Sequence, residues 1–311
     1  MRFIGADEVH AGLGYGDLAD ALARAFREGA EVPVRHRHDL GRDASLLLMP
    51  AWREGGATGV KIVTVTPANR TRGLPAIAAS FLLFDGETGQ PLALIDGPAL
   101  TERRTAAASA LAARYLAPSG AARHLMVGAG ALAPHLVRAH AEARPITGVR
   151  IWNRTPNRAE ALAASLRAEG IDATATEGLE AAARWADIIS CATLASEPLI
   201  HGAWLRPGQH LDLVGAFRPD MRECDDETVR RARLYVDVRE SALAEAGDLA
   251  GPLSQGVIAA SDIAGDLATL SRGEDAGRTT EDEITLFKSV GTALEDLAAA
   301  ETLWASLVPV L

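Results

Sequence analysis

The sequence contains very little lysine. Of its 31 basic residues only Lys61 and Lys288 are lysines, and all the others are arginines. Arginine therefore serves wherever a solvated positive charge is needed, and a lysine is expected where a compact ammonium group with an adjustable pKa is required. This pattern predicts a functional role for Lys61 in particular. The alternative is a composition bias in which two lysines remain by chance.

Cysteine, long apolar runs and an excess of basic charge are also missing. The only cysteines, Cys191 and Cys224, cannot cross-link 311 residues, so we expect reduced thiols and a cytoplasmic protein. No run of about 18 apolar residues is present, and the first eight residues do not form a signal peptide, so we expect no membrane association. A net charge of −10 argues against general binding to nucleic acid. No CxxC or HExxH spacing occurs, and His36 with His38 is weak support for a metal, so we expect none.

The order of apolar segments predicts two domains of different type. Residues 1–118 form an α+β pattern, and from residue 119 strands alternate with helices, which is typical of a doubly wound, Rossmann-like parallel sheet with right-handed crossovers. The closing stretch, 283–307, has the pattern of one long helix interrupted by Gly291 and is a candidate to return to the first domain. The expected fold class is therefore α/β with an additional α+β domain.

Individual elements follow from periodicity and breakers. A helix is expected over 16–28 and another from Thr101 to about Pro118. The strands expected in the first domain are 46–49, ending at Pro50, and 59–66, 80–84 and 91–96. The strands expected in the second domain are 124–127, 149–153, 186–191, 210–214 and 234–238.

A glycine-rich turn predicts a dinucleotide site. The triplet Gly128-x-Gly130-x-x-Ala133 follows a strand and opens an apolar helix, as binding of a pyrophosphate requires. Gly128 permits the turn, Gly130 lets the backbone approach the phosphates, and the small Ala133 lets helix and strand pack closely. The helix amino terminus then offers free N–H groups to the phosphates. The alternative is a glycine turn without a ligand.

The end of the next strand favours NADP(H), with NAD(H) as the less favoured alternative. An NAD site usually has a carboxylate about 20 residues beyond the glycines. This chain instead has Asn153-Arg154-Thr155, with Arg158 one turn further on. The Arg154 guanidinium can bind a 2′-phosphate with a forked geometry. The alternative is that Arg154 is a solvated surface residue.

Lys61 lies in an expected strand, where it shares a face with Val63 and Val65 and is expected to point toward apolar surroundings. Arg35, Arg37 and Arg103-Arg104 are further basic groups that would form a carboxylate pocket if they converged with Lys61. A lysine in an edge strand that discourages aggregation is the alternative.

The chain resembles the ornithine cyclodeaminase/mu-crystallin family over essentially its full length. The motifs that carry this resemblance occur together and in order: Val-Pro-Val-Arg35, Leu-Met-Pro50-Ala, Gly-Val-Lys61, Arg104-Thr-Ala-Ala-Ala-Ser, Gly128-Ala-Gly130, Ile-Trp-Asn153-Arg154-Thr155 and Phe-Lys288-Ser-Val-Gly291. The resemblance implies a homodimer, with a substrate-binding and dimerisation domain formed by 1–118 plus 292–311 and a dinucleotide-binding domain over 119–291. It also implies that Arg35, Lys61 and Arg104 bind the substrate carboxylate and that Lys61 is catalytic. Arg37 is the alternative to Arg35 if the alignment is shifted by two residues.

The expected cofactor site extends over several loops. Its residues are Gly128, Ala129, Gly130, Ala131, Asn153, Arg154, Thr155, Arg158, Ala192, Thr193, Val214, Gly215, Ser289 and Gly291.

One position separates the activities within the family. Cyclodeaminases have a catalytic aspartate where this chain has Phe217, which cannot exchange a proton. The resemblance therefore implies an NADPH-dependent reductase of small cyclic imino acids, Δ1-pyrroline-2-carboxylate or Δ1-piperideine-2-carboxylate, that forms proline or pipecolate. An ornithine or lysine cyclodeaminase, an alanine-type dehydrogenase and a non-catalytic NADPH-binding protein remain as alternatives. Asp220 remains a possible proton donor if its loop folds inward.

Overall fold

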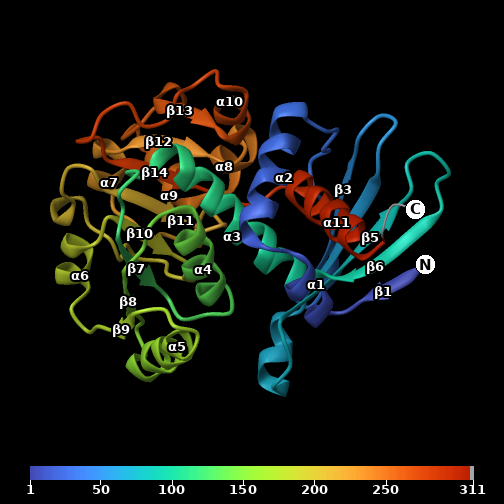
Figure 1. Ribbon diagram of the computed structural model, residues 1–311, viewed down its shortest axis with the longest axis horizontal. Coiled ribbons are helices and arrows are strands. Elements are labelled where there is room, and N and C mark those ends of the chain that lie inside the picture. Colours follow the sequence, from blue (N-terminus) through green and yellow to red (C-terminus); the bar gives the residue numbers. More distant parts are fainter. Residues whose placement is uncertain (309–311) are drawn as a thin grey trace. The chain divides into compact units, whose positions relative to one another are not determined.

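The computed structural model describes residues 1–308, apart from the side chain of Arg70. The chain forms two compact units, Met1–Thr105 with the segment from Thr292 on, and Ala106–Gly291 (Figure 1). The first division falls inside a helix, α3 (Gly97–Leu116), and not at the Pro118-Ser119-Gly120 stretch where the sequence places it. An uninterrupted helix can serve two units because a change of packing partner needs no break in its backbone. Residues 309–311, which the sequence assigns to the first domain, lie outside the described residues.

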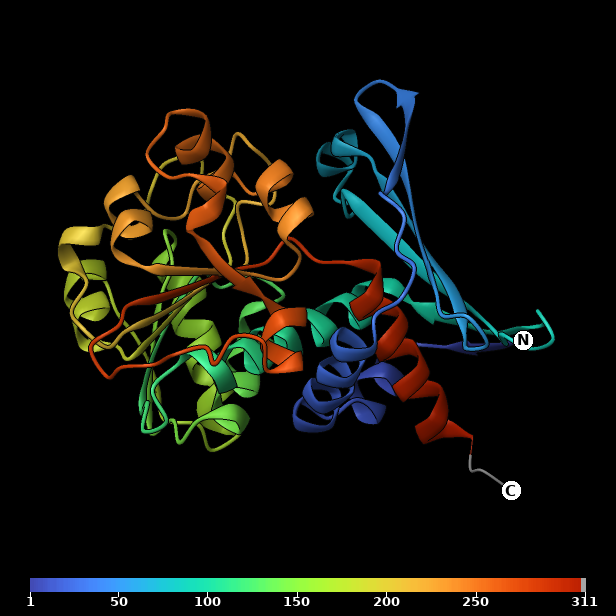
Figure 2. The same ribbon diagram turned by 90° about the horizontal axis from the view of Figure 1, so that it is seen from above.

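The first unit is built on a six-stranded sheet with the order β1-β6-β5-β4-β3-β2. Its strands are β1 (Arg2–Ile4), β2 (His36–Gly41), β3 (Ala44–Trp52), β4 (Thr58–Val65), β5 (Ile77–Phe84) and β6 (Pro91–Asp96). Its helices are α1 (Ala6–Gly12), α2 (Tyr15–Glu28) and α11 (Ala293–Leu307), with a 3-10 turn at Pro67–Arg72. Helix α11 packs on β3, β4 and β5, and α2 packs on α11 (Figure 2). The last helix of the chain therefore covers the same sheet as the first ones.

Several element boundaries differ from the sequence-based prediction, for example the start of β5 at Ile77, and two of the differences have a local cause. Strand β3 continues through Pro50, because β2 begins at His36, opposite Leu48, and the missing N–H of Pro50 interrupts no β2 ladder. Helix α3 begins at Gly97 rather than at Thr101, because the carboxylate of Asp96 accepts the N–H of Ala99 at 2.9 Å and caps the helix there.

The second unit contains an eight-stranded sheet with the order β13-β12-β14-β11-β10-β7-β8-β9, and every pairing in it is parallel. Its strands are β7 (Arg123–Val127), β8 (Gly148–Trp152), β9 (Ala173–Ala175), β10 (Ile188–Cys191), β11 (His210–Leu213), β12 (Arg233–Val236), β13 (Ile263–Asp266) and β14 (Thr285–Lys288). Its helices after α3 are α4 (Ala133–Ala143), α5 (Pro156–Ala168), α6 (Leu179–Trp185), α7 (Asp226–Arg231), α8 (Arg239–Glu245), α9 (Gly247–Ser254) and α10 (Leu267–Arg272), with 3-10 turns at Gly202–Trp204 and Ala260–Asp262. The strand order reverses direction between β7 and β10, so the prediction of a doubly wound parallel sheet is confirmed.

The expectation of one long helix over 283–307 is wrong. Residues Thr285–Lys288 form β14, a fully buried strand between β11 and β12, and the helix begins only at Ala293. A strand that is buried on both faces carries no alternating polar pattern, so its apolar run is hard to distinguish from a helix segment. Thr292 caps α11 by accepting the N–H of Leu294.

A buried carboxylate connects the helices of the second unit to its sheet. Asp212 on β11 is fully buried and accepts hydrogen bonds from Ser109 on α3 at 2.8 Å, from Ser190 on β10 at 2.9 Å and from His140 on α4 at 2.9 Å. Burial raises the pKa of Asp212, but the bond from His140 and the nearby histidines outweigh it, so its pKa lies below the usual range. Asp212 therefore stays ionised near neutral pH.

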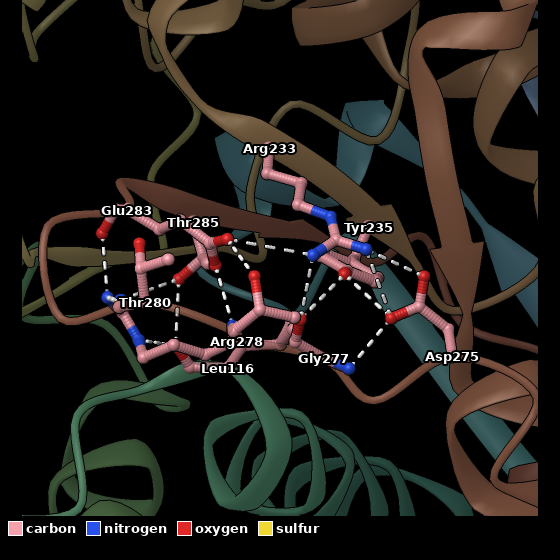
Figure 3. A network of polar contacts seen from close by, with 10 residues as sticks. Leu116, Arg233, Tyr235, Asp275, Gly277, Arg278, Thr280, Glu283 and Thr285 are labelled. Carbon is pink, nitrogen blue, oxygen red and sulfur yellow. Dashed lines mark hydrogen bonds and ion pairs between the residues drawn. The ribbon is translucent and has the colours of Figure 1, made fainter.

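A second polar network lies where α3 ends (Figure 3). The Arg278 guanidinium donates to the carbonyl oxygens of Leu116 and Glu283, both at 2.7 Å, and to the Thr285 hydroxyl at 3.2 Å. The Thr285 hydroxyl in turn donates to Leu116 at 2.9 Å. These bonds connect the end of α3 to the beginning of β14.

Within residues 1–308, no helix combines the length and the apolar composition that crossing a bilayer requires.

Candidate active site

The glycine turn after β7 has the geometry that a bound pyrophosphate needs. Gly128 has a φ of 110°, and a Cβ atom there would lie 2.6 Å from the Ala192 carbonyl oxygen, so only glycine fits. A Cβ at Gly130 would meet no described atom of the chain within 4 Å, so the backbone is open to a ligand at that point. Ala133 is fully buried at the start of α4. The residues present therefore fit a dinucleotide cofactor.

Asn153 stabilises this turn from the neighbouring strand. Its side-chain oxygen accepts the N–H of Ala129 at 3.2 Å, and its amide nitrogen donates to the Thr155 carbonyl oxygen at 3.0 Å. The expected cofactor-binding role of Asn153 is thus accompanied by a structural one, which connects the glycine turn to the end of β8. The Ala129 N–H already has a partner in this arrangement.

Arg154 and Arg158 lie just beyond β8, and both are exposed. Among the described residues no ion pair of either guanidinium with a carboxylate is present, whereas Arg167 on α5, the helix that contains Arg158, pairs with Glu160 at 2.8 Å. The place where an NAD site usually has a carboxylate therefore presents two positive charges.

The other predicted cofactor residues lie together at the carboxyl ends of adjacent strands. Ala192 and Thr193 follow β10, Val214 and Gly215 follow β11, and Ser289 to Gly291 follow β14. Backbone bonds connect these loops: Val214 N–H donates to Cys191 O at 2.8 Å and Ser289 N–H to Leu213 O at 3.2 Å. The buried Asp237 carboxylate accepts the Gly291 N–H at 2.6 Å. Ligands of open α/β sheets bind at this edge, near the point where the strand order reverses.

Lys61 is buried in the first unit, with 4% of its surface exposed. It lies on β4, an interior strand between β3 and β5, so the edge-strand alternative is excluded. Its ammonium forms an ion pair with Asp296 Oδ2 on α11 at 2.5 Å. Burial lowers the pKa of Lys61 to about 8, although Asp296 favours the charged form.

Arg104 meets the same carboxylate. Its Nε donates to Asp296 Oδ1 at 3.0 Å, and its terminal nitrogen donates to Glu295 at 2.5 Å. Asp296 therefore bridges two of the three predicted carboxylate-binding residues. Burial raises the pKa of Asp296, but Lys61 and Arg104 outweigh it, so this pKa lies below its usual range. Asp296 is thus the counter-ion of Lys61 in the protein without substrate, and the binding of a substrate carboxylate by Lys61 stays a prediction.

The position of the third predicted residue follows from the strand register. Arg35 immediately precedes β2, whose first residue, His36, pairs with Leu48. Arg35 is therefore level with Met49, which pairs with Lys61. Arg37 lies further along the edge strand, opposite Leu47, and is exposed. The register brings Arg35 nearer to the row of Lys61 than Arg37.

The sequence-based reasoning missed Asp296 and Glu295. Both are fully buried near the start of α11. A signal was present: two adjacent acidic residues in the otherwise apolar stretch Ala-Leu-Glu295-Asp296-Leu-Ala-Ala-Ala. Acidic side chains in such surroundings require buried cations as partners.

Two residues that bear on the alternative activities lie on the loop after β11. The Phe217 side chain is 40% exposed, and the following Arg218 pairs with Asp220 at 3.0 Å. Both members of this pair are exposed, so the structure does not bring Asp220 into a buried cluster.

The chain has relatives over nearly its whole length. A Δ1-pyrroline-2-carboxylate reductase of Paracoccus denitrificans is 42% identical over 93% of this chain and 94% of its own. The solved structure of the Thermococcus litoralis Δ1-pyrroline-2-carboxylate reductase in complex with NADH and L-proline has a TM-score of 0.93 at 35% identity, covering 98% and 97% of the two chains. An archaeal alanine dehydrogenase dimer with bound NAD has a TM-score of 0.91 at 29% identity, covering 98% and 95%.

The Paracoccus denitrificans and Thermococcus litoralis relatives are both Δ1-pyrroline-2-carboxylate reductases, which is the activity expected from the sequence. The family model for ornithine cyclodeaminase/mu-crystallin matches residues 4–308. The expected resemblance is confirmed: the chain belongs to the ornithine cyclodeaminase/mu-crystallin family.

Proposed function

We propose that the protein is an NADPH-dependent reductase that converts small cyclic imino acids, Δ1-pyrroline-2-carboxylate or Δ1-piperideine-2-carboxylate, to proline or pipecolate. The observation that carries this proposal is the buried pair Lys61 and Arg104, oriented by one carboxylate, in a family whose relatives reduce such substrates. Arg35 is the third proposed contact of the substrate carboxylate.

The protein's own contribution is orientation and charge. The nicotinamide, when bound, supplies the hydride that reduces the carbon of the C=N bond. Lys61 and Arg104 bind the substrate carboxylate, which fixes the position of the adjacent imine carbon. Asp296 and Glu295 already balance the charge of both cations, so the substrate carboxylate is held by hydrogen bonds from the two oriented donors rather than by net positive charge. The cyclic imine is readily protonated in water, so the reaction needs little further acid from the chain.

The cofactor site supports NADPH over NADH. The Gly128 and Gly130 backbone accommodates the pyrophosphate, and Arg154 with Arg158 binds the 2′-phosphate. Thr193, Gly215, Ser289 and Gly291 are the proposed contacts at the nicotinamide end, together with Ala192 and Val214.

An alanine-type dehydrogenase is the second candidate, favoured by the similarity to the archaeal enzyme. Such an enzyme would prefer an open-chain keto acid with ammonia over a cyclic imino acid. A cyclodeaminase is disfavoured because Phe217 carries no titratable group and Asp220 pairs with Arg218 on the surface. A protein that only binds NADPH is disfavoured because relatives over nearly the whole chain are reductases.

We also propose a homodimer formed through the sheet of the first unit. The face of this sheet opposite Lys61 carries apolar side chains that are half-buried or exposed: Leu46, Leu48, Val60, Ile62, Leu82 and Leu94. Helix α11 covers the other face, since Leu297 contacts the position of Gly59. A second copy of the sheet would remove this apolar face from water, and the archaeal relative is a dimer.

A cytoplasmic location is proposed from the thiols. Cys191 and Cys224 are both free and buried. Burial raises the pKa of each thiol well above its ordinary value, which keeps it protonated. Both residues are thus suited to a reducing compartment.

A substrate panel tests the proposed activity. We expect NADPH oxidation with Δ1-pyrroline-2-carboxylate or Δ1-piperideine-2-carboxylate at a higher kcat/KM than with open-chain keto acids and ammonia. Ornithine, without added cofactor, is expected to release no ammonia. A preference for a keto acid would establish the dehydrogenase alternative, and ammonia release from ornithine would establish a cyclodeaminase.

The cofactor preference is expected to depend on Arg154. The protein should favour NADPH over NADH by at least about tenfold in kcat/KM, because a hydrogen bond to a charged group contributes roughly 1.5–3 kcal/mol. Arg154→Ala should remove most of this difference and leave the NADH kinetics nearly unchanged. Arg167→Ala, which removes an exposed arginine from the helix that follows Arg154, α5, is the control. Equal use of the two cofactors by the unaltered protein contradicts the assignment.

Substitution of Lys61 tests the substrate site. Lys61→Ala should reduce kcat/KM for the imino acid about a hundredfold, on the order of 3 kcal/mol, while the dissociation constant of NADPH changes little. Lys61→Arg should also be poor, because a planar guanidinium cannot replace the compact ammonium. Because the pKa of Lys61 is about 8, kcat/KM of the unaltered enzyme should fall as the ammonium loses its proton above that pH. Intact turnover with only a lowered Tm would show that Lys61 is structural.

The dimer is tested by a charge on its apolar sheet face. Ile62→Glu should give a species with the mass of one 32.6 kDa chain in sedimentation, whereas the unaltered protein should have twice that mass. Ile77→Glu places the same charge on the opposite face of the same sheet, at a residue that is also exposed, and should remain dimeric. An unaltered protein that sediments as a single chain contradicts the proposal.

A further inference from the structure

The second lysine of the chain lies in a fully buried cluster of charges. Lys288 on β14 forms an ion pair with Asp248 Oδ2 at 3.1 Å and lies 3.9 Å from Glu223 Oε2. Its ammonium also donates to the carbonyl oxygen of Gly215. Lys288, Glu223 and Asp248 are each 0% exposed, so solvent does not screen their interactions.

The Glu223 carboxylate oxygen that faces away from Lys288, Oε1, bonds to the loop that follows β10. This oxygen accepts the N–H of Thr193 at 2.7 Å and the hydroxyl of Thr193 at 2.8 Å. The Thr193 hydroxyl in turn accepts the N–H of Ala195 at 3.3 Å. One carboxylate oxygen therefore determines the conformation of this loop.

The loop after β11 packs against the same carboxylate. A Cβ atom at Gly215 would lie 2.3 Å from Glu223 Oε1 and 2.3 Å from the Thr193 carbonyl oxygen. Any side chain at this position would displace either Glu223 or the loop after β10. Gly215 is thus a glycine because three segments approach one another around Glu223.

Asp248 positions Glu223 itself. Located on α9, it accepts the backbone N–H groups of Glu223 at 2.7 Å and of Cys224 at 3.1 Å through Oδ1. Its other oxygen pairs with Lys288. The cluster therefore connects α9, β14 and the loops after β10 and β11, and these two loops carry four of the predicted cofactor residues.

The cluster contains two carboxylates and one ammonium, so it has one uncompensated negative charge when all three groups are ionised. Burial, opposed by Lys288 and reinforced by Asp248, raises the pKa of Glu223 to about 7. Burial raises the pKa of the nearby Cys191 and Cys224 thiols well above the ordinary value, so both stay neutral. The carboxylates of Asp212 and Asp225, which act on these thiols together with Arg222, have pKa values below their usual range and stay charged. Glu223 is therefore the group whose charge changes near neutral pH.

We propose that Glu223 is a positioning residue of the cofactor site, which in its charged form holds the loops after β10 and β11 for the nicotinamide cofactor and on protonation weakens that hold. A charged acceptor forms hydrogen bonds roughly twice as strong as a neutral one, so the bonds to Thr193 depend on the charge. Lys288 keeps this charge in place without contacting the cofactor. The inference rests on the proposed cofactor site.

The test compares NADPH dissociation constants of the unaltered protein and Glu223→Gln. At about pH 8.5, where Glu223 is charged, the variant should bind about tenfold more weakly; at about pH 6, where Glu223 is protonated, the two should agree within about twofold. Because the result is a ratio at each pH, titration of the cofactor's own phosphate cancels. A lowered Tm with an unchanged ratio at both pH values overturns the proposal, and so does an equal loss at both.

Asp212→Asn is the matched control. Asp212 is an equally buried carboxylate on the strand that precedes Gly215, and its partners Ser109, Ser190 and His140 lie outside the loops. This variant should lower Tm and leave the NADPH dissociation constant in the same ratio to that of the unaltered protein at both pH values. A pH-dependent ratio for Asp212→Asn would show that general destabilisation, and not Glu223, weakens binding.

Asp248→Asn supplies an independent variant and carries the test if Glu223→Gln does not fold. Removing this neighbouring negative charge lowers the pKa of Glu223, so the pH at which NADPH binding weakens should move below that of the unaltered protein. An unmoved midpoint overturns the proposal. An unaltered protein that binds neither NADPH nor NADH instead refutes the proposed cofactor site, which distinguishes the two failures.

Discussion

The structure of the first unit depends on the pairing of a buried ammonium with a buried carboxylate. Placing an unpaired ion in a protein interior costs several kcal/mol, and Lys61 is 4% exposed on an interior strand. The Lys61 ammonium pairs with Asp296 Oδ2 at 2.5 Å, and the other carboxylate oxygen of Asp296 bonds to Arg104. Because Asp296 lies on α11, the last helix must pack on the sheet formed by the first hundred residues. The ion pair between Lys61 and Asp296 thus both orients the predicted substrate-binding cations and connects α11 to the sheet of the first unit.

Buried carboxylates play a comparable part in the second unit. Asp237 accepts a backbone N–H of the loop after β14, Glu223 accepts two donors of the loop after β10, and Asp248 fixes Glu223. Backbone bonds fix the first residues of the loops at the carboxyl edge of this sheet, and buried carboxylates accept further backbone N–H groups there. In this chain most of those side chains are acidic, and the single ammonium of Lys288 lies among them. Lys288 contacts Asp248 Oδ2, Glu223 Oε2 and the Gly215 carbonyl oxygen, and a compact ammonium with three donors is suited to such a set of acceptors.

Local patterns in the sequence predicted the parts of the structure that depend on short-range geometry. The strand phase of 59–66 predicted the burial of Lys61, and the glycine turn at Gly128 predicted the first crossover of the parallel sheet. The counter-ion Asp296 was not predicted, because it is distant from Lys61 in the sequence and only the fold brings the two together. Strand β14 was mistaken for part of a helix, because burial on both faces removes the alternation that identifies a strand.

The boundaries of elements depended on tertiary context in the same way. Pro50 was expected to end a strand, but the neighbouring strand β2 does not extend to it. The residues around Arg154 were interpreted correctly as lacking a carboxylate, since that property belongs to the sequence itself. Their contact with a 2′-phosphate remains a prediction. The resemblance to a family supplied what local patterns could not, namely the prediction that three basic residues bind one substrate carboxylate.

The central claim is that Asp296 holds Lys61 and Arg104 in place for a substrate carboxylate. A crystal structure of the protein with NADPH and L-proline tests it most directly. We expect the proline carboxylate within about 3 Å of both Lys61 Nζ and the Arg104 guanidinium, with both cations still bonded to Asp296. A proline carboxylate bound elsewhere, with Lys61 contacting only Asp296, would contradict it.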